Sequence, residues 1–375
     1  MKYMWIIAAI FASIVMVFIF YPHLLNLVKC GLPKTRDLNC YKYNIIKSQE
    51  PKELQKAAFY NSFDIPDSLK EGMRQYKTNA LLIVQDNEII FEKYWNGFDS
   101  ATVSNSFSAG KTVTGLLVGI ALDKGYIKSL DQKVSDFLPN FDKGKDTLLT
   151  VEDLLTMSSG LKWSEKFNNI FSDVVKAYYT NNLKPLIKKT HVVSTPGKIM
   201  EYQCVNSLLL GQIIEHTSGM PIAQFAQKYL WNKIGATHDA FWTTDKNGIT
   251  RTFCCFYATA RDYAKMGLLV LNNGKYIDGT YVLPDDYIQR MTSPNTFLKN
   301  KKGETVDYYG YQMWITHYKG YTIPYFRGMF GQYVFIIPGK NAVIVRLGDK
   351  RTEQMKNHTP IDAFIYLEAA FDILR

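Results

Sequence analysis

The hydrophobic pattern changes its period along the chain, which predicts strands at both ends of the main body and helices between them. Residues 80–84 are apolar and residues 88–94 alternate, and the polar Gln85-Asp86-Asn87 turn between them predicts a β-hairpin. A second series of short apolar segments near the C-terminus contains the tight turn at residues 338–341. This series predicts strands over residues 310–317, 321–326, 332–337 and 342–347.

The middle of the chain carries apolar residues at helical spacing. Residues 108–124 have apolar side chains three and four positions apart and end at Gly125, a typical helix cap. Thr150 and Asp153 predict the start of another helix with a capping box. The same spacing predicts further helices over residues 205–216, 258–272 and 360–374. Because the strands at both ends must bury a face, we expect them to meet in one sheet of an α/β fold, with a mostly helical insertion over about residues 130–300.

The chain begins with an apolar segment. No residue from Tyr3 to Val28 carries a full charge, and residues 4–20 are almost entirely apolar. About 20 apolar residues are enough to span a bilayer, and no small-residue cleavage site follows the segment. We therefore expect an uncleaved signal anchor over residues 1–28; a cleaved signal peptide and a buried helix are the alternatives.

The segment after the apolar run is expected to form a tether. Three prolines punctuate residues 29–75, and the main domain is expected over residues 76–375. One lysine precedes the apolar run, whereas Lys29, Lys34 and Arg36 follow it. By the positive-inside rule this small bias places the main domain in the cytoplasm.

Composition and charge narrow the classes of protein that remain. With 47% hydrophobic and 21% charged residues among 375, the chain is typical of a globular protein and not of a disordered chain or a coiled coil. The net charge of +10, from 44 Lys and Arg against 34 Asp and Glu, favours solubility and a weak attraction to anionic surfaces. No Arg-rich arm, zinc-finger spacing or RNA-binding signature accompanies this charge, so no nucleic-acid partner is expected.

The cysteines and histidines give no sign of a metal site. No pair of them has zinc-binding spacing, so neither a metal nor another cofactor is expected. Cys30 and Cys40 either close a small loop as a disulfide or stay as free thiols. Cys204 either forms a bridge with Cys254 or Cys255, or all three are buried thiols.

Ser108 and Lys111 lie one turn apart at the start of the helix predicted over residues 108–124. A serine hydroxyl becomes a nucleophile only with a base within hydrogen-bond reach. A lysine can be that base when burial and the helix dipole lower its pKa. The ordinary alternative is a capping serine and a surface lysine. A phosphate-binding loop would need glycine where Asn105 stands, and it is not expected.

Several motifs in order along the chain make the Ser-Lys interpretation more specific. They lie at residues 106–111, 150–161, 196–211, 258–267, 309–314 and 328–332. With these motifs, residues 79–375 resemble the serine β-lactamase-like and penicillin-recognising hydrolases. Within that family they are similar to the branch of class C β-lactamases, carboxylesterases and 6-aminohexanoate-dimer hydrolases. The resemblance implies an antiparallel sheet flanked by helices.

The resemblance also implies roles for individual residues. Ser108 is expected to be the nucleophile, Lys111 to accept or relay its proton, and Tyr202 to protonate the leaving group. The backbone N–H groups of Ser108 and Met329 are expected to form the oxyanion hole. The implied reaction is acyl transfer, with an acyl-enzyme on Ser108 that water then hydrolyses.

Departures from the family pattern affect the expected substrate. The usual Tyr-x-Asn is Tyr202-Gln203-Cys204, and the third motif has neither Lys-Thr-Gly nor the nylon-hydrolase histidine, whose place Phe330 takes. The cation that grips a β-lactam or D-alanine carboxylate is therefore missing unless Arg327 replaces it. The expected substrate-binding residues are Cys204, Trp314, Arg327 and Gln332. Three aromatic residues either line an acyl pocket or pack in the core: Trp163, Trp314 and Tyr333.

We therefore expect a serine hydrolase that acts on small esters or linear amides. A peptidoglycan-type D,D-peptidase or weak β-lactamase is the first alternative, and a non-catalytic binding protein on the same fold is the second. Relatives with an N-terminal apolar segment usually act outside the cytoplasmic membrane. We accordingly expect a membrane-anchored, extracytoplasmic main domain, against the weak charge bias.

Overall fold

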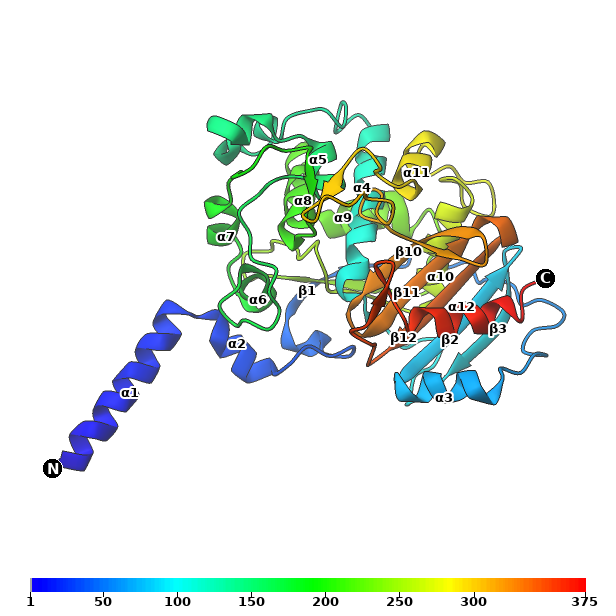
Figure 1. Ribbon diagram of the computed structural model, residues 1–375, viewed down its shortest axis with the longest axis horizontal. Helices are drawn as coiled ribbons and strands as arrows, with labels where there is room; N and C mark the ends of the chain where they lie inside the picture. Colours follow the sequence, from blue (N-terminus) through cyan, green and yellow to red (C-terminus); the bar gives the residue numbers. More distant parts are fainter. Residues whose placement is uncertain (1) are drawn as a thin grey trace.

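The strands from the two ends of the chain meet in one antiparallel sheet. The computed structural model describes residues 2–375. The sheet consists of β2 (Thr78–Gln85), β3 (Glu88–Tyr94), β9 (Trp314–Tyr318), β10 (Tyr321–Gly328), β11 (Gln332–Ile337) and β12 (Ala342–Gly348). Their order is β3-β2-β12-β11-β10-β9, and every neighbouring pair is antiparallel. The β2–β12 pairing, in which Ile83 lies opposite Ile344, joins the two ends and confirms the predicted sheet (Figure 1).

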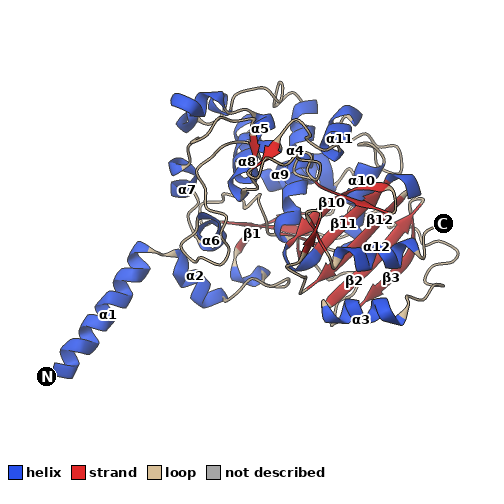
Figure 2. Cartoon of the chain, in the orientation of Figure 1, coloured by secondary structure: helices blue, strands red, loops and turns tan. Residues whose placement is uncertain are grey.

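Local sequence explains the hairpin turn and the burial of its strands. Asp86 and Asn87 have φ of 51° and 66°, the left-handed conformation that closes a two-residue hairpin. Side chains of β2 alternate between two cores, so that Leu82 joins the core that contains α10 (Ala260–Leu271) and Leu81 joins the core that contains α12 (Ala363–Phe371). Helices thus cover both faces of the sheet, and α3 (Asp67–Gln75) packs beside α12 (Figure 2).

The predicted helical insertion lies beside this sheet. Helix α4 (Gly110–Asp123) contacts α8 (Cys204–Ser218) and β10, so it joins the helical region to the sheet. Thr150 and Asp153 form the predicted capping box at the start of α5 (Val151–Leu155), and α8 ends at Gly219 in the left-handed conformation. The remaining helices of this region are α6 (Asp173–Tyr179), α7 (Lys184–Lys189), α9 (Ile222–Ala226) and α11 (Asp285–Thr292).

Smaller sheets complete the fold. A four-stranded sheet has the order β1-β6-β7-β4 and contains β1 (Lys42–Ile46), β4 (Ser104–Asn105), β6 (Ala240–Thr244) and β7 (Phe256–Ala258). Two-residue strands form two further pairs: β5 (Ile199–Met200) with β8 (Lys299–Asn300), and β13 (Met355–Lys356) with β14 (Thr359–Pro360).

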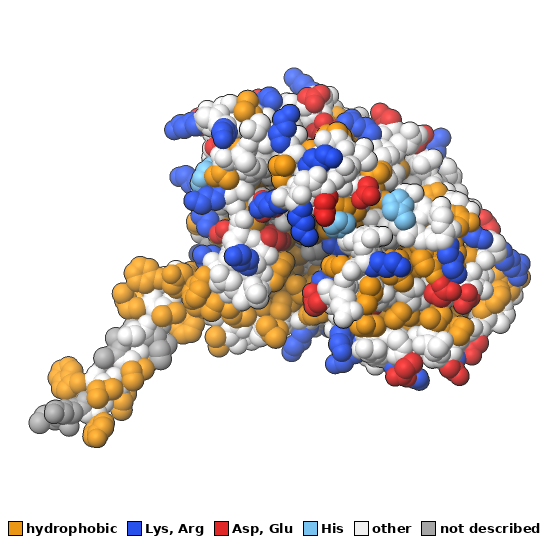
Figure 3. All heavy atoms as spheres, viewed as in Figure 1, with side chains coloured by type: hydrophobic (Ala, Val, Ile, Leu, Met, Phe, Trp, Pro, Cys, Tyr) orange, Lys and Arg blue, Asp and Glu red, His pale blue; other side chains and the backbone are white. Residues whose placement is uncertain are grey.

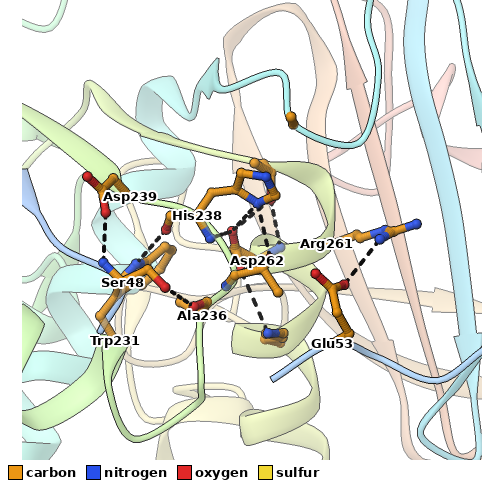
Figure 4. A network of polar contacts seen from close by, with 12 residues as sticks. Ser48, Glu53, Trp231, Ala236, His238, Asp239, Arg261 and Asp262 are labelled. Carbon is orange, nitrogen blue, oxygen red and sulfur yellow. Dashed lines mark hydrogen bonds and ion pairs between the residues drawn. The ribbon is translucent and has the colours of Figure 1, made fainter. Parts of the chain in front are cut away.

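Residues 42–56, which lie inside the segment expected to be a tether, are attached to the main domain. Strand β1 pairs with β6 along its whole length. The Ser48 amide donates to Asp239 Oδ1 at 2.8 Å, and Glu53 forms an ion pair with Arg261 at 3.2 Å. Nearby, the buried carboxylate of Asp262 accepts from the Thr237 amide at 2.7 Å at the start of α10 (Figure 4). This polar network fixes the early segment against the body.

The N-terminal helix α1 (Lys2–Phe20) projects away from the body (Figure 1). Figure 3 shows hydrophobic side chains exposed along it. Trp5 and Phe11 are among these exposed residues. The next helix, α2 (His23–Cys30), is docked, with Asn26 Nδ2 donating to Tyr179 O at 2.6 Å. Within residues 2–375, no helix meets the length and apolarity that crossing a membrane requires, so the spanning anchor expected over residues 1–28 is not supported.

Candidate active site

Ser108 lies in a tight turn between β4 and α4. The residue before it, Phe107, has a φ of 46°, which is unfavourable for a bulky side chain. Two contacts hold this conformation. The Phe107 amide donates to Asn105 Oδ1 at 2.8 Å, and the Phe107 ring packs edge-on against Phe330 with 5.2 Å between ring centres. As a result, Ser108 is half-buried at the wall of a cavity while the helix behind it is buried.

Lys111 lies in the first turn of α4 and is 1% exposed. Its Nζ donates to Ser108 Oγ at 3.1 Å and to the backbone oxygen of Phe253 at 2.8 Å. Tyr202 lies just before α8, and its ring centre is 5.0 Å from Lys111 Nζ. Ser108 and Lys111 both act on the Tyr202 hydroxyl and favour its charged form. The structure thus brings the three predicted catalytic residues together.

The pKa of Lys111 differs from the sequence-based expectation. Burial lowers it, but the charges that Cys204, Tyr202 and Glu165 can carry outweigh burial, and the pKa of Lys111 is raised. Burial also raises the pKa of Tyr202, against the opposing effect of Lys111. At neutral pH Lys111 is therefore an ammonium and Tyr202 a phenol. The expected lowering of the Lys111 pKa is wrong because it considered burial and the helix dipole but not these three neighbours.

Gly328 allows β10 to approach the turn that carries the nucleophile. A Cβ atom at this position would lie 2.1 Å from Ser106 O, which no side chain can tolerate. Met329 follows directly and lines the same cavity as the nucleophile. Gln332 is buried behind this turn, and its Nε2 donates to Met329 O at 3.2 Å and to Gly348 O at 2.6 Å. Gln332 therefore holds the Met329 turn in place and does not line the cavity.

The cavity beside Ser108 has a volume of about 390 Å³. Its wall combines aromatic rings with side chains of both charges: Phe167, Tyr202, Phe330, Arg327, Lys350, Arg351, Asp349 and Glu353. The Arg327 guanidinium lies 3.2 Å from the ring centre of Trp314 and donates to His358 O at 2.7 Å. Trp314 also packs against Tyr202, with 5.2 Å between ring centres, so it supports the wall from behind.

The other two candidate aromatic residues lie apart from the cavity wall. Tyr333 is fully buried in the core against α12, and its hydroxyl donates to Asp362 Oδ2 at 3.1 Å. Trp163 is also buried, and its indole N–H donates to Glu165 Oε2 at 2.9 Å. Both residues therefore pack in the protein interior and do not line an acyl pocket.

Cys204 faces a carboxylate that the sequence analysis did not single out. Its buried free thiol donates to Glu165 Oε1 at 2.7 Å, and its amide donates to Glu165 Oε2 at 2.9 Å. No motif marks Glu165, and its loop is distant from Cys204 in the sequence. The backbone oxygen of Phe253 was missed for a similar reason, because any residue type can supply a carbonyl.

Two disulfides lie within the part of the chain that the structure describes. Cys30 and Cys40 are bonded, which decides between the two alternatives for that pair. Cys254 is bonded to its neighbour Cys255 and Cys204 is a free buried thiol, so neither alternative, a bridge from Cys204 or three free thiols, describes these cysteines. The Cys254–Cys255 bond directly follows Phe253 and stiffens the loop that holds Lys111. Across residues 2–375, no group of three or more His, Cys, Asp or Glu side chains is arranged to hold a metal ion.

Comparison with known proteins agrees with this geometry. The model of the Beta-lactamase family matches residues 67–364. A 6-aminohexanoate-dimer hydrolase from Paenarthrobacter ureafaciens is 25% identical over 297 residues, which cover 76% of this chain and 75% of that protein. An Escherichia coli K12 protein provisionally named D-alanyl-D-alanine carboxypeptidase is 27% identical over 193 residues, or 44% of this chain and 43% of that protein.

A solved structure supports the fold. A Bacillus anthracis protein provisionally named 6-aminohexanoate-dimer hydrolase superposes with a TM-score of 0.77 at 21% sequence identity. The superposition covers 91% of this chain and 92% of that protein. The α/β architecture with its antiparallel sheet is therefore the β-lactamase-like fold that the motifs predicted.

The disulfide arrangement can be tested by peptide mapping without reduction. We expect a cross-linked peptide pair that contains Cys30 and Cys40, and one peptide that lacks two hydrogens because Cys254 and Cys255 are bonded to each other. Cys204 should be alkylated only after unfolding, since its thiol is buried. A peptide that joins Cys204 to either neighbour would contradict this arrangement.

Proposed function

The chain belongs to the beta-lactamase family and is a hydrolase, and we propose that it cleaves small esters or linear amides through an acyl-enzyme on Ser108. The observation that carries this proposal is the contact of 3.1 Å between Lys111 Nζ and Ser108 Oγ, with the Tyr202 ring centre 5.0 Å from the same Lys111 Nζ. A nucleophile, a proton-transferring pair and a cavity of about 390 Å³ then share one site.

The proposed reaction has two steps. In acylation, Ser108 Oγ attacks the substrate carbonyl and its proton passes to the Lys111–Tyr202 pair. Tyr202 then protonates the departing alcohol or amine as the bond to the carbonyl breaks. In deacylation, a water molecule gives a proton to the same pair and attacks the acyl carbonyl. The bond from this carbon to Ser108 Oγ then breaks, Ser108 Oγ takes the proton back from the pair, and the carboxylic acid leaves. The N–H groups of Ser108 and Met329 would bind the oxyanion, and one such donor contributes about 3 kcal/mol.

A second candidate function is a peptidase for peptides that end in a carboxylate. The observation that favours it is the position of Arg327 on the cavity wall. Lys350 also lines the cavity, whereas Arg351 is paired with Glu353 at 3.6 Å. Arg327 would take the place of the absent Lys-Thr-Gly lysine. A positive charge at this position would also bind the terminal carboxylate of a linear amide built from amino acids.

We also propose that the main domain lies outside the cytoplasm. The disulfides Cys30–Cys40 and Cys254–Cys255 support this location, because such bonds persist in oxidising compartments and are rare in the cytosol.

Substitutions in the three residues should separate catalysis from folding. Ser108→Ala should lower kcat/KM for p-nitrophenyl esters about a thousandfold or more, and Tyr202→Phe about a hundredfold or more. Ser159→Ala and Tyr276→Phe are matched controls, because these buried hydroxyls have no hydrogen-bond partner in the described residues. Full hydrolysis by Ser108→Ala would contradict the proposal.

Activity should rise with pH above neutrality. The raised pKa values of Lys111 and Tyr202 mean that the pair holds both protons at pH 7, and it can accept the Ser108 proton only after losing one. We therefore expect kcat/KM for an ester to increase between about pH 7 and about pH 9. A rate that stays level or falls over this interval would show that the pair is already deprotonated at neutral pH.

The location can be tested with a fused reporter. Alkaline phosphatase joined after residue 50 should be active, because it folds only where disulfides form. An inactive phosphatase, together with an active cytoplasmic reporter at the same junction, would place the domain in the cytoplasm.

A further inference from the structure

Glu165 is a half-buried carboxylate beside the proposed site and has no role in the reaction described above. Both of its oxygens are occupied. Oε2 accepts from the Trp163 indole at 2.9 Å and from the Cys204 amide at 2.9 Å, while Oε1 accepts from the Cys204 thiol at 2.7 Å. Three hydrogen bonds from two segments therefore fix the orientation of this side chain.

The contacts of Glu165 place it at the beginning of α8. Cys204 is the first residue of that helix, and the preceding Gln203 makes no side-chain cap. The side chain of Gln203 is instead turned to Leu161 O, to which it donates at 3.1 Å. The Glu165 carboxylate thus accepts one of the free N–H groups at the start of α8, where a negative charge is also favourable. Tyr202 lies two residues earlier, so this contact anchors the segment that carries it.

Glu165 also contributes charge to the surroundings of Lys111. The titratable groups that act on Lys111 are Tyr202, Cys204 and Glu165. Burial raises the pKa of the Cys204 thiol well above its usual range and raises that of Tyr202, so both are uncharged at neutral pH. A carboxylate is normally charged there. Glu165, held against Cys204 at 2.7 Å, is therefore the carboxylate among the three groups that act on Lys111.

The other groups packed around Lys111 and Tyr202 are Tyr309, Arg327 and Phe253. Tyr309 packs against Tyr202 with 6.1 Å between ring centres, and burial raises its pKa well above the usual range. Arg327 acts on Tyr309 from its position over Trp314. Phe253 contributes its carbonyl oxygen to Lys111 Nζ and no formal charge.

We propose that Glu165 is a positioning residue of the acyl-transfer site: it holds the start of α8, and with it Tyr202, beside Lys111, and it supplies the negative charge opposite the Lys111 ammonium. This inference rests on the proposed function of Ser108, Lys111 and Tyr202. It assigns two separable properties to one side chain, namely its reach to Cys204 and its charge.

Two variants separate these properties. Glu165→Gln keeps the length of the side chain and removes its charge, whereas Glu165→Asp keeps the charge and shortens the reach. The measurement is the rate of Ser108 labelling by a fluorophosphonate as a function of pH, followed by intact mass. Glu201→Gln is the matched control, because Glu201 precedes Tyr202 directly but pairs with Lys301 at the surface.

The two variants should change different parts of the pH profile. In Glu165→Gln, the rise in rate should move to lower pH by about one unit, because the Lys111–Tyr202 pair loses its first proton more easily without the negative charge. In Glu165→Asp, the rise should stay at the wild-type pH, but the maximal rate should fall about tenfold because the shorter side chain cannot hold both Cys204 atoms. Glu201→Gln should match the wild type.

The possible contrary results are distinct. A rise at the wild-type pH in Glu165→Gln would overturn the charge assigned to Glu165, and so would an equal displacement of the rise in Glu165→Asp. If Glu165→Gln does not fold, the pH of the rise in Glu165→Asp still tests the inference. Absence of labelling in the folded wild type at every pH would instead overturn the proposed function, and the inference with it.

Discussion

A buried ammonium group is the constraint on which the rest of this site depends. Lys111 is 1% exposed, and an isolated charge at such a position would be strongly destabilising. Its Nζ is instead held by Ser108 Oγ and Phe253 O. These partners come from the turn before α4 and from the loop before β7. The fold must bring both segments, together with Tyr202 before α8, to the first turn of one helix.

The packing around α4 explains how this is achieved. Helix α4 contacts both α8 and β10, so it joins the helical region to the large sheet. Thr114 Oγ1 donates to Thr252 O at 2.7 Å, one residue before the carbonyl that accepts from Lys111. The adjacent Cys254–Cys255 bond restrains the same loop. Gly328 then permits β10 to come close enough to Ser106 for the Met329 turn to border the cavity.

The sequence predicted the parts of this arrangement that depend on local pattern. The Asp86-Asn87 hairpin, the Thr150 capping box and the helices around α4, α8 and α10 follow from side-chain spacing and turn chemistry. The ordered motifs identified the family and located Ser108, Lys111 and Tyr202. Residues 42–46 were not predicted as a strand, because β1 exists only through its pairing with β6, almost 200 residues away.

The parts that sequence could not predict depend on contacts between distant segments. Nothing local distinguishes Glu165 from a solvated glutamate, and its effect on Lys111 arises only when its loop meets α8. The direction of the Lys111 pKa was therefore predicted wrongly, although the residue itself was identified. Gln332 was expected to bind substrate and Tyr333 to line an acyl pocket or pack in the core. Adjacent residues of β11 point to opposite faces of the sheet, and because both faces are covered, both side chains are buried.

The most direct test of the central claim, an activated serine at position 108, is intact-mass labelling of residues 29–375 with a fluorophosphonate, and separately with a penicillin. The proposed chemistry predicts one fluorophosphonate adduct in the wild type and none in Ser108→Ala. A lasting penicillin adduct as well would favour the second candidate function, a peptidase. A folded wild type that forms no adduct with either reagent would contradict an activated serine and leave a binding protein on the same fold.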